Sequence, residues 1–401
     1  MDSEQIELTL PASPKPKYAH LFRTGAEVAR LTWVGGGKPR ESGKLHLDDR
    51  RAERAFHDEI RRRMAEGYVV LGERATAEPG ELILECAPRG MCRDVTFDLA
   101  PDGRTLTVAT WDSSDGAWIY LVDVATGVQR TVHTEPPGPH YPAIDAVLFG
   151  RGGDQLVYTV NDETRRLDLS TGRTEVLADC PRPDPERHTY LPQPSFDAAR
   201  ERVFVFDAGQ RALVLDTDGK PLLDLDTTGS GVCFRGRLSP SGRLLALAFD
   251  DAGVIEIWDV DTGERTARLR SPYRRDGARF RGVAEFAFHP GERLLLVNGW
   301  HPDRLRAVDI ETEEVVPVTS GEDRCSAFAV TPDGTRLALA EPGGSWRDGR
   351  IAFRDAESFE EAPGSAVMST AGRVRRIAFS ADGTLMVTGS YRDRVSVYAV
   401  G

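Results

Sequence analysis

The clearest pattern in the sequence is a series of short apolar runs separated by turn residues. One unit, from Val232 to Arg270, reads VCFRGRLSPSGRLLALAFDDAGVIEIWDVDTGERTARLR. Three apolar runs alternate with the turns SPSG, DDAG and DTGE, and a weaker fourth run, RTARLR, ends the unit. Gly favours turns because it adopts positive φ, and Asp because its side chain hydrogen-bonds nearby backbone. The unit therefore predicts four short strands joined by tight turns.

The same order of runs and turns recurs along most of the chain. The first turns are marked, in order, by Pro101-Asp102-Gly103, Gly152-Gly153-Asp154, Asp197-Ala198, Ser241-Gly242, Pro290-Gly291, Pro332-Asp333-Gly334 and Asp382-Gly383. The third runs end at Asp123, Asp168, Asp216, Asp259, Asp309 and Asp355. These Asp positions are 43 to 50 residues apart. That spacing is typical of a four-stranded propeller blade.

The third runs also carry the motif of a known family. IEIWDVDTG, from Ile255 to Gly263, contains the pair Trp258-Asp259, and LVDVATG, RLDLSTG, AVDIETE and VLDTDGK are degenerate copies. On these motifs residues 81–401 resemble the WD-repeat β-propellers, although the Gly-His dipeptide common in that family is absent from every copy. The resemblance implies a mainly β fold with a seven-bladed propeller, one blade for each first turn. Trp258 would then pack between blades.

The last unit lacks a fourth strand of its own. The sequence ends at DRVSVYAVG, just after the third strand of that unit. The apolar segment GELILECAPRG, from Gly80 to Gly90, precedes the first unit and has no partner there. We therefore expect residues 81–87 to be the strand that completes the last blade. This pairing would close the ring and cover an otherwise exposed strand edge.

The first eighty residues follow other patterns. PASPKPK indicates an extended, Pro-stiffened arm over residues 1–17. The apolar runs AHLFRT and EVARLTWV indicate a hairpin around Gly25. The Gly-rich segment GGGKPRESG predicts a loop over residues 35–43.

A helix is predicted after this loop. Asp48 or Asp49 can cap its start and Gly67 can end it. The apolar residues of one helix face recur every four positions, at Ala52, Phe56, Ile60 and Met64. The expected domains are the arm (1–17), a small α+β domain (18–78) and the propeller (79–401).

The α+β domain resembles a WGR domain. The resemblance rests on the helix AFHDEIRRRMAEGY and on Trp33, which ends a strand before a Gly-rich loop. The signature Trp-Gly-Arg reads Trp33-Val34-Gly35 here, which is a departure from the family pattern. In poly(ADP-ribose) polymerases the signature Trp and nearby basic residues contact DNA ends. The resemblance implies that nucleic-acid contacts would come from Trp33, Lys38, Arg40, Lys44, Arg61, Arg62 and Arg63.

Charge supports the same hypothesis. The whole chain carries a net charge of −12, yet residues 15–74 hold fourteen Lys and Arg against nine Asp and Glu. A basic head on an acidic ring could bind a phosphate backbone with an affinity that depends on salt. The alternative is that the run Arg61–Arg63 is a solvated helix end, where cations are favoured by the helix dipole.

The sequence shows few signs of catalytic chemistry. GKPRESGKL, from Gly37, has the wrong spacing for a P-loop, with Leu45 where Ser or Thr must reach magnesium, and no G-x-S-x-G or H-E-x-x-H occurs. The acidic clusters DLDTTG and DVDTG are interpreted as turns rather than calcium loops. A metal-dependent propeller hydrolase of lactonase type stays an alternative, with Asp94, Glu285 and Asn298 as conceivable inward ligands. We expect no cofactor and no enzymatic activity.

Binding is the more plausible function. The aromatic and Arg residues at strand ends are candidates for a propeller rim that binds a partner protein, because Trp, Tyr and Arg dominate interface hot spots. They are Trp111, Arg235, Trp300, Trp346, Arg375 and Tyr391. The leading hypothesis is a non-catalytic scaffold, and the alternative is an adaptor that binds DNA or RNA through its head. The five cysteines are scattered and form no C-x-x-C pair, which favours a cytoplasmic protein. The sequence has no long apolar run, so we expect no membrane contact. The high ratio of Arg to Lys favours a bacterial source.

Overall fold

A computed structural model gives the fold of the chain. It describes residues 3–12, 14–89, 96–112, 114–137, 144–160, 163–179, 193–207, 210–231, 233–249, 253–273, 283–299, 304–319, 324–342, 349–362, 368–370, 373–390 and 394–401. In this part of the chain β-strands dominate and α1 (Asp49–Ala65) is the one helix. The expectation of a mainly β fold is therefore confirmed.

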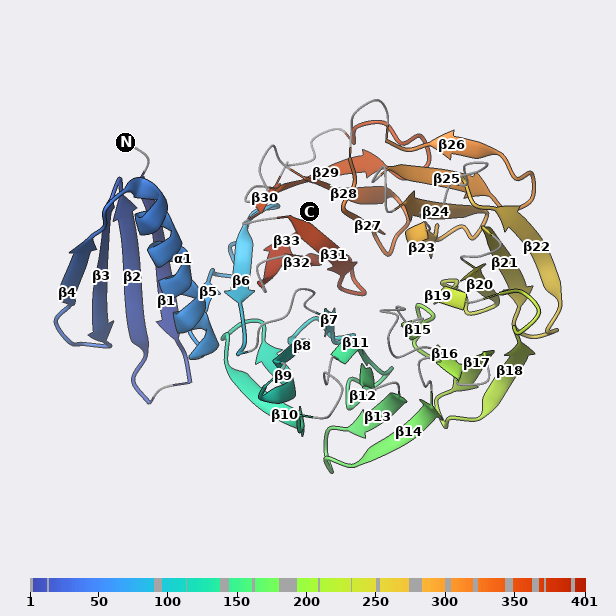
Figure 1. The fold of residues 1–401 in the computed structure, drawn as a ribbon, viewed down its shortest axis with the longest axis horizontal. Coiled ribbons are helices and arrows are strands. Elements are labelled where there is room, and N and C mark those ends of the chain that lie inside the picture. Colours follow the sequence, from blue (N-terminus) through green and yellow to red (C-terminus); the bar gives the residue numbers. More distant parts are fainter. Residues whose placement is uncertain are drawn as a thin grey trace.

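Seven antiparallel sheets follow one another along the chain after the first eighty residues, and Figure 1 shows them around a common centre. The strands of the first four are β7 (Thr96–Leu99), β8 (Thr105–Asp112), β9 (Gly116–Asp123), β10 (Gln129–Glu135), β11 (Ile144–Phe149), β12 (Gln155–Val160), β13 (Glu163–Asp168), β14 (Thr174–Asp179), β15 (Ser195–Phe196), β16 (Arg202–Asp207), β17 (Arg211–Asp216), β18 (Pro221–Asp226), β19 (Cys233–Leu238), β20 (Leu244–Phe249), β21 (Val254–Asp259) and β22 (Arg265–Arg270).

The other three sheets complete this series. Their strands are β23 (Val283–Phe288), β24 (Leu294–Gly299), β25 (Leu305–Asp309), β26 (Val315–Pro317), β27 (Ala327–Val330), β28 (Arg336–Pro342), β29 (Gly349–Asp355), β30 (Met368–Thr370), β31 (Val374–Phe379), β32 (Leu385–Ser390), β33 (Val395–Ala399), β6 (Leu82–Cys86) and β5 (Val70–Leu71). In the first six sheets the first strand along the chain lies nearest the common centre, and in the last sheet β31 does, so that β7, β11, β15, β19, β23, β27 and β31 surround it (Figure 1).

The sequence repeat matches these sheets strand for strand. The unit from Val232 to Arg270 forms β19 to β22, and the six predicted third strands end at the Asp residues named from the sequence. Each of these Asp side chains accepts hydrogen bonds from backbone N–H groups two to four residues further on; Asp168 Oδ1, for example, lies 2.8 Å from Thr171 N. The acidic clusters that these six carboxylates begin are therefore turns, as interpreted from the sequence.

The last sheet is completed from the other end of the chain. Its strand order is β31-β32-β33-β6-β5, and β6 pairs antiparallel with β33. Val395 lies opposite Cys86, and Val397 opposite Leu84. The predicted pairing of the segment near residues 81–87 with the C-terminal strand is confirmed.

Residues between neighbouring sheets form the core. Phe204 on β16 is fully buried, and Gly236 on β19 lies so close that an added Cβ would overlap the Phe204 ring. Trp258 packs against the same cluster of buried residues, as expected from its place in the repeat. Tight packing of this kind holds neighbouring sheets against each other.

The N-terminal residues form a separate four-stranded antiparallel sheet with α1 against one face (Figure 1). Its strands are β1 (Ser3–Leu10), β2 (Lys17–Thr24), β3 (Glu27–Val34) and β4 (Arg40–Leu45). The predicted helix is confirmed. Asp48 Oδ1 accepts a 2.7 Å hydrogen bond from Arg51 N as its N-cap. The apolar helix residues Ala52, Phe56, Ile60 and Met64 are buried against the sheet.

Two predictions for this region are wrong. Residues 3–10 are not part of a free arm, because β1 pairs with β2 along its whole length and Leu8 is fully buried. The Pro-rich residues that suggested an arm occupy only the connection between the two strands. The predicted loop over 35–43 is shorter, because β4 pairs with β3 from Arg40 onwards. Every residue of β4 is exposed, so no apolar alternation marks it in the sequence.

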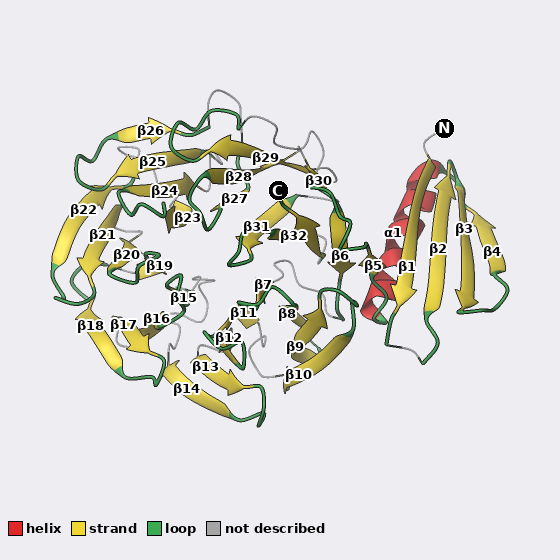
Figure 2. Cartoon of the chain, turned by 180° about the vertical axis from the view of Figure 1, so that it is seen from behind, coloured by secondary structure: helices red, strands yellow, loops and turns green. Residues whose placement is uncertain are grey.

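Backbone hydrogen bonds join this N-terminal sheet to the ring. Thr9 and Val69 exchange two hydrogen bonds of 2.8 Å, and the next residues form β5, which pairs with β6. Val69 is fully buried in the core cluster of the last and first ring sheets. Figure 2 shows β5 between the two parts of the chain. Within the described residues, no helix is both long and apolar enough to span a bilayer.

Candidate functional site

The seven nucleic-acid candidates of the head do not form one surface. Side chains directly opposite each other on paired strands share a face of the sheet. Arg40 lies opposite Thr32, and Lys44 opposite Val28, which packs in the core beneath α1. These two basic residues therefore belong to the helix side. Trp33 is one residue on from Thr32 and belongs to the opposite, open side.

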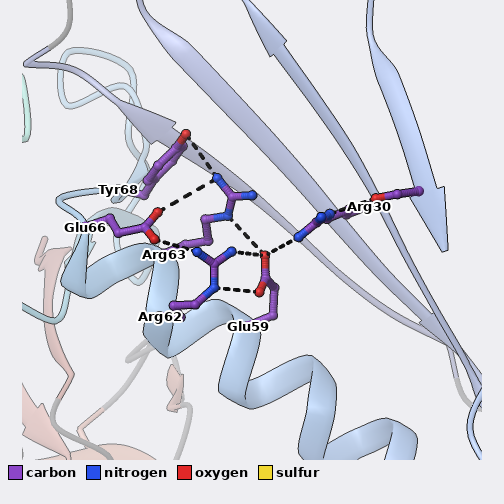
Figure 3. Close-up of polar contacts among 7 residues, drawn as sticks. Arg30, Glu59, Arg62, Arg63, Glu66 and Tyr68 are labelled. Carbon is purple, nitrogen blue, oxygen red and sulfur yellow. Dashed lines mark hydrogen bonds and ion pairs between the residues drawn. The ribbon is translucent and has the colours of Figure 1, made fainter. Parts of the chain in front are cut away.

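Arg62 and Arg63 near the end of α1 are already engaged (Figure 3). Glu59 accepts from both, at 2.6 Å and 3.1 Å, and also from Arg30 of β3 at 3.1 Å. Burial alone would raise the pKa of the Glu59 carboxyl, but the hydrogen bonds from these Arg side chains lower it to about 2. Arg63 also lies over the ring of Tyr68. Both cations are therefore engaged at their own end of the helix, whereas Arg30 links Glu59 to the sheet.

The remaining basic candidates are exposed. They are Lys38, Arg40, Lys44 and Arg61. The structure gives none of them a hydrogen bond or an ion pair with another described residue. They remain available to an anionic partner, but they lie on the loop before β4, on β4 itself and on α1 rather than in one cluster.

Trp33 belongs to an aromatic strip on the open side of the sheet, formed by Tyr18, His20, Phe22 and Trp33. The Tyr18 and Trp33 rings stack with 5.1 Å between their centroids and 17° between their planes. His20 and Phe22, two residues apart on β2, lie 3.9 Å apart. All four side chains are half-buried, and no helix covers this side (Figure 2). Only the signature position of Trp33 was visible in the sequence, because the neighbours come from pairing β2 with β3.

The structure places the six candidate residues of the propeller rim in different environments. Trp300, Trp346 and Tyr391 lie outside the described residues. Trp111, at the end of β8, packs against the core clusters of the first two ring sheets, so part of its surface is committed to packing. Arg235 is half-buried, and its Nε donates a 3.1 Å hydrogen bond to Ala284 O of the next sheet. Arg375 on β31 is exposed.

Hydrogen bonds between neighbouring ring sheets involve side chains on or beside their innermost strands. Thr96 Oγ1 accepts from Val147 N, Gln193 donates to Asp145 O, Ser195 Oγ accepts from Leu238 N, Arg235 donates to Ala284 O, Asn298 donates to Cys325 O, Ser326 donates to Val374 O, and Arg376 donates to Thr96 Oγ1. These bonds bridge each of the seven junctions, including the one between the last sheet and the first.

The centre of the ring holds charged residues that sequence reasoning missed or left unassigned. Arg200 donates to Asp98 Oδ2 at 2.6 Å, 102 residues away, and Asp98 also accepts from Phe149 N at 2.8 Å. Arg237 on β19 lies 3.8 Å from Glu285 on β23. Their positions in the repeat could have marked them, because each lies on the first strand of its unit or, for Arg200, in the turn that follows it.

The ligand set of the hydrolase alternative lies only partly within the described residues. Asp94 lies outside them, while Glu285 and Asn298 are opposite each other on β23 and β24. Asn298 Nδ2 donates to Cys325 O at 3.0 Å. The part of the chain that the structure describes has no group of three His, Cys, Asp or Glu arranged to hold a metal ion. The near-P-loop from Gly37 lies in a turn and in β4, so it does not form the N-terminus of α1.

Comparison with protein-family models and with curated proteins found no match for this chain.

Proposed function

We propose that this chain is a non-catalytic interaction scaffold. Its seven ring sheets form a closed seven-bladed β-propeller of the WD-repeat class, completed by β6, and its N-terminal α+β unit is a WGR-like module. The propeller rim binds a partner protein, and the basic module provides a second contact. Buried thiols at Cys86 and Cys233 support the cytoplasm as its location.

The observation that carries this proposal is the set of bridging bonds around the ring. Each of the seven sheet junctions has a hydrogen bond between different sheets, and the last sheet is bonded to the first by Arg376 and Thr96. A frame tied at every junction holds its connecting loops in fixed relative positions. Loops on such a frame are the usual place for binding residues.

Affinity capture from a lysate of the source organism, followed by rebinding of the purified partner, tests the proposal. The baits are the full chain, the rim variant Arg375→Glu and the head variant Trp33→Ala. We expect one discrete protein to survive nuclease treatment with the wild type and with Trp33→Ala, and to be lost with Arg375→Glu. Retention that disappears with nuclease, or with Trp33→Ala, moves the function to the head.

A nucleic-acid adaptor is the second candidate, and the stacked pair Tyr18 and Trp33 favours it. Half-buried aromatic rings on an open sheet face can stack on unpaired bases, and cations elsewhere on the head contribute a salt-dependent attraction to phosphates. Titration of labelled single-stranded and duplex probes at two salt concentrations tests this function. Binding that weakens with salt and falls with Trp33→Ala supports it, while absent or salt-insensitive binding eliminates it.

A further inference from the structure

The charged side chains of the head sheet are divided between its two faces. Successive residues of a strand point to opposite faces, and Leu8, Leu21 and Val28 mark the helix side because they pack beneath α1. Counted from these positions, the Lys and Arg residues of the four strands all lie on the helix side. They are Lys17, Arg23, Arg30, Arg40 and Lys44. The described strands of the head therefore place no Lys or Arg on the open side.

The open side carries carboxylates instead. Glu7 on β1, Glu27 on β3 and Glu41 on β4 belong to this side, and all three are exposed. The structure gives none of them an ion pair or a side-chain hydrogen bond with another described residue. These three negative charges are therefore available to a cationic partner.

One row of side chains crosses the open side from carboxylate to carboxylate. Glu7 lies opposite His20 of β2. Leu31 of β3 lies between His20 and Glu41 of β4. Neighbouring strands are about 4.8 Å apart, so the two strands that carry the carboxylates are about 14 Å apart. The half-buried aromatic strip lies between them, on β2 and β3.

We propose that this open side binds a basic amphipathic helix of a partner protein. An α-helix with its side chains is about 10–12 Å wide, slightly less than the distance between β1 and β4. Such a helix can lay an apolar stripe on the aromatic strip while Lys or Arg on its two flanks reach the carboxylates on either side. The chain's own helix, α1, packs on the other face of the sheet (Figure 2).

The same charges disfavour a nucleic acid on this face. Phosphate groups would approach three carboxylates there, and like charges repel each other. The excess of Lys and Arg over residues 15–74 does not change this, because the Lys and Arg of the strands belong to the helix side. The inference rests on the proposed scaffold function and gives its second contact a ligand class, a basic protein segment.

Binding of a synthetic peptide to the full chain tests the inference. The labelled peptide has Leu at helical spacing along one face and Lys on both flanks of that face. A control peptide has the same composition in an order without helical periodicity. By fluorescence anisotropy we expect the amphipathic peptide to bind with an affinity that falls as salt rises. The control peptide should bind at least about tenfold more weakly, because it cannot place its apolar residues on the strip together.

Variants of the open side locate the binding. Glu7→Gln and Glu41→Gln should each weaken it by about twofold to fivefold, as is usual for one exposed ion pair. Trp33→Ala should weaken it by about tenfold or more, because Trp contributes strongly at interfaces. Asp58→Asn removes a negative charge from the exposed side of α1 and should leave binding unchanged. The two Gln variants change only exposed side chains, so they test the surface even if Trp33→Ala fails to fold.

The rim variant Arg375→Glu should bind the peptide as the wild type does, so that failure of the rim proposal and failure of this one can be told apart. The inference is overturned if the wild type does not bind the amphipathic peptide, or binds both peptides equally. It is also overturned if the Gln variants bind as the wild type does, or if Asp58→Asn weakens binding as much as they do. Tighter binding of a single-stranded oligonucleotide that is lost with Trp33→Ala would assign the face to nucleic acid instead.

Discussion

Arg394 donates a 2.9 Å hydrogen bond to Glu85 across 309 residues of chain. Both side chains are buried, and Ser396 donates to the other Glu85 oxygen at 3.1 Å. Glu85 belongs to β6 and Ser396 to β33, the two strands that bring the start and the end of the ring together. Within the described part of the ring, the pair therefore lies where sheet pairing joins strands from distant parts of the sequence.

Removing one partner of the Glu85–Arg394 pair should destabilise the protein. Glu85→Ala leaves the Arg394 guanidinium buried without its partner, which we expect to destabilise the protein by about 3–5 kcal/mol. Urea unfolding measures the change. The double variant Glu85→Ala with Arg394→Leu should recover part of the loss, because no uncompensated charge remains.

An exposed ion pair is the matched control for this prediction. Arg211 Nε donates to Asp224 at 2.8 Å on the outside of the third ring sheet. Asp224→Ala should cost less than about 1 kcal/mol, as is usual for solvent-exposed pairs. Equal losses for Glu85→Ala and Asp224→Ala would contradict a special role for the closing pair.

The close packing of neighbouring sheets predicts that an added side chain between them lowers stability. Gly236→Ala places a Cβ against the fully buried Phe204 ring of the preceding sheet, and overpacking of this kind costs about 3 kcal/mol. Gly229 has open space around its Cβ position, so Gly229→Ala should change stability by less than about 0.5 kcal/mol. Differential scanning calorimetry compares the two variants. A neutral Gly236→Ala would show that the two sheets pack less closely than described.

The stability of the head should depend on pH because of Glu59. Its pKa in the folded chain is about 2, below the usual value of 4.5, so the carboxylate stabilises the fold fully above pH 4.5 and loses this effect as the pH falls towards 2. Glu59→Gln should therefore destabilise the protein by about 1–2 kcal/mol at pH 7, a range reduced for partial exposure.

The same substitution should matter progressively less in acid. Circular dichroism of α1 during denaturation at pH 7, 5 and 3 follows the difference between wild type and Glu59→Gln. Asp58→Asn on the exposed side of the same helix is the control, and its effect should stay near zero throughout. A difference for Glu59→Gln that is the same at pH 7 and pH 3 would argue against the ion-pair network.

The repeat could be predicted from the sequence because local chemistry repeats with it. In the first six units the third strand ends at an Asp that accepts hydrogen bonds from its own turn, as Asp259 does from Thr262 N at 3.0 Å. Because such signals span only a few residues, they can be recognised without any knowledge of tertiary contacts. The strand over residues 81–87 could be predicted from the same repeat, because the last unit has no fourth strand of its own.

The parts that sequence could not predict depend on tertiary pairing. β4 is polar and exposed, so only its backbone bonds to β3 reveal it. The charges at the centre, such as Asp98 and Arg200, meet across 102 residues and have no motif in common. The basic head residues were grouped because they are close in sequence, whereas the pleat of the sheet separates Trp33 from Lys44.

The scaffold proposal depends on closure of the ring, and one engineered cysteine tests it directly. Val395 lies opposite the native Cys86 in the pairing of β33 with β6. Residues facing each other on antiparallel strands have Cα atoms about 4.5–5.5 Å apart, within the range that a disulfide bridges. Mild oxidation of Val395→Cys, followed by mass spectrometry of the linked peptides, is the measurement. Val397→Cys, which faces Leu84, is its control.

We expect a link between residues 86 and 395 within one chain, formed in Val395→Cys and absent from Val397→Cys. A variant that stays reduced although folded, or that links only two separate chains, would contradict closure of the ring by β6.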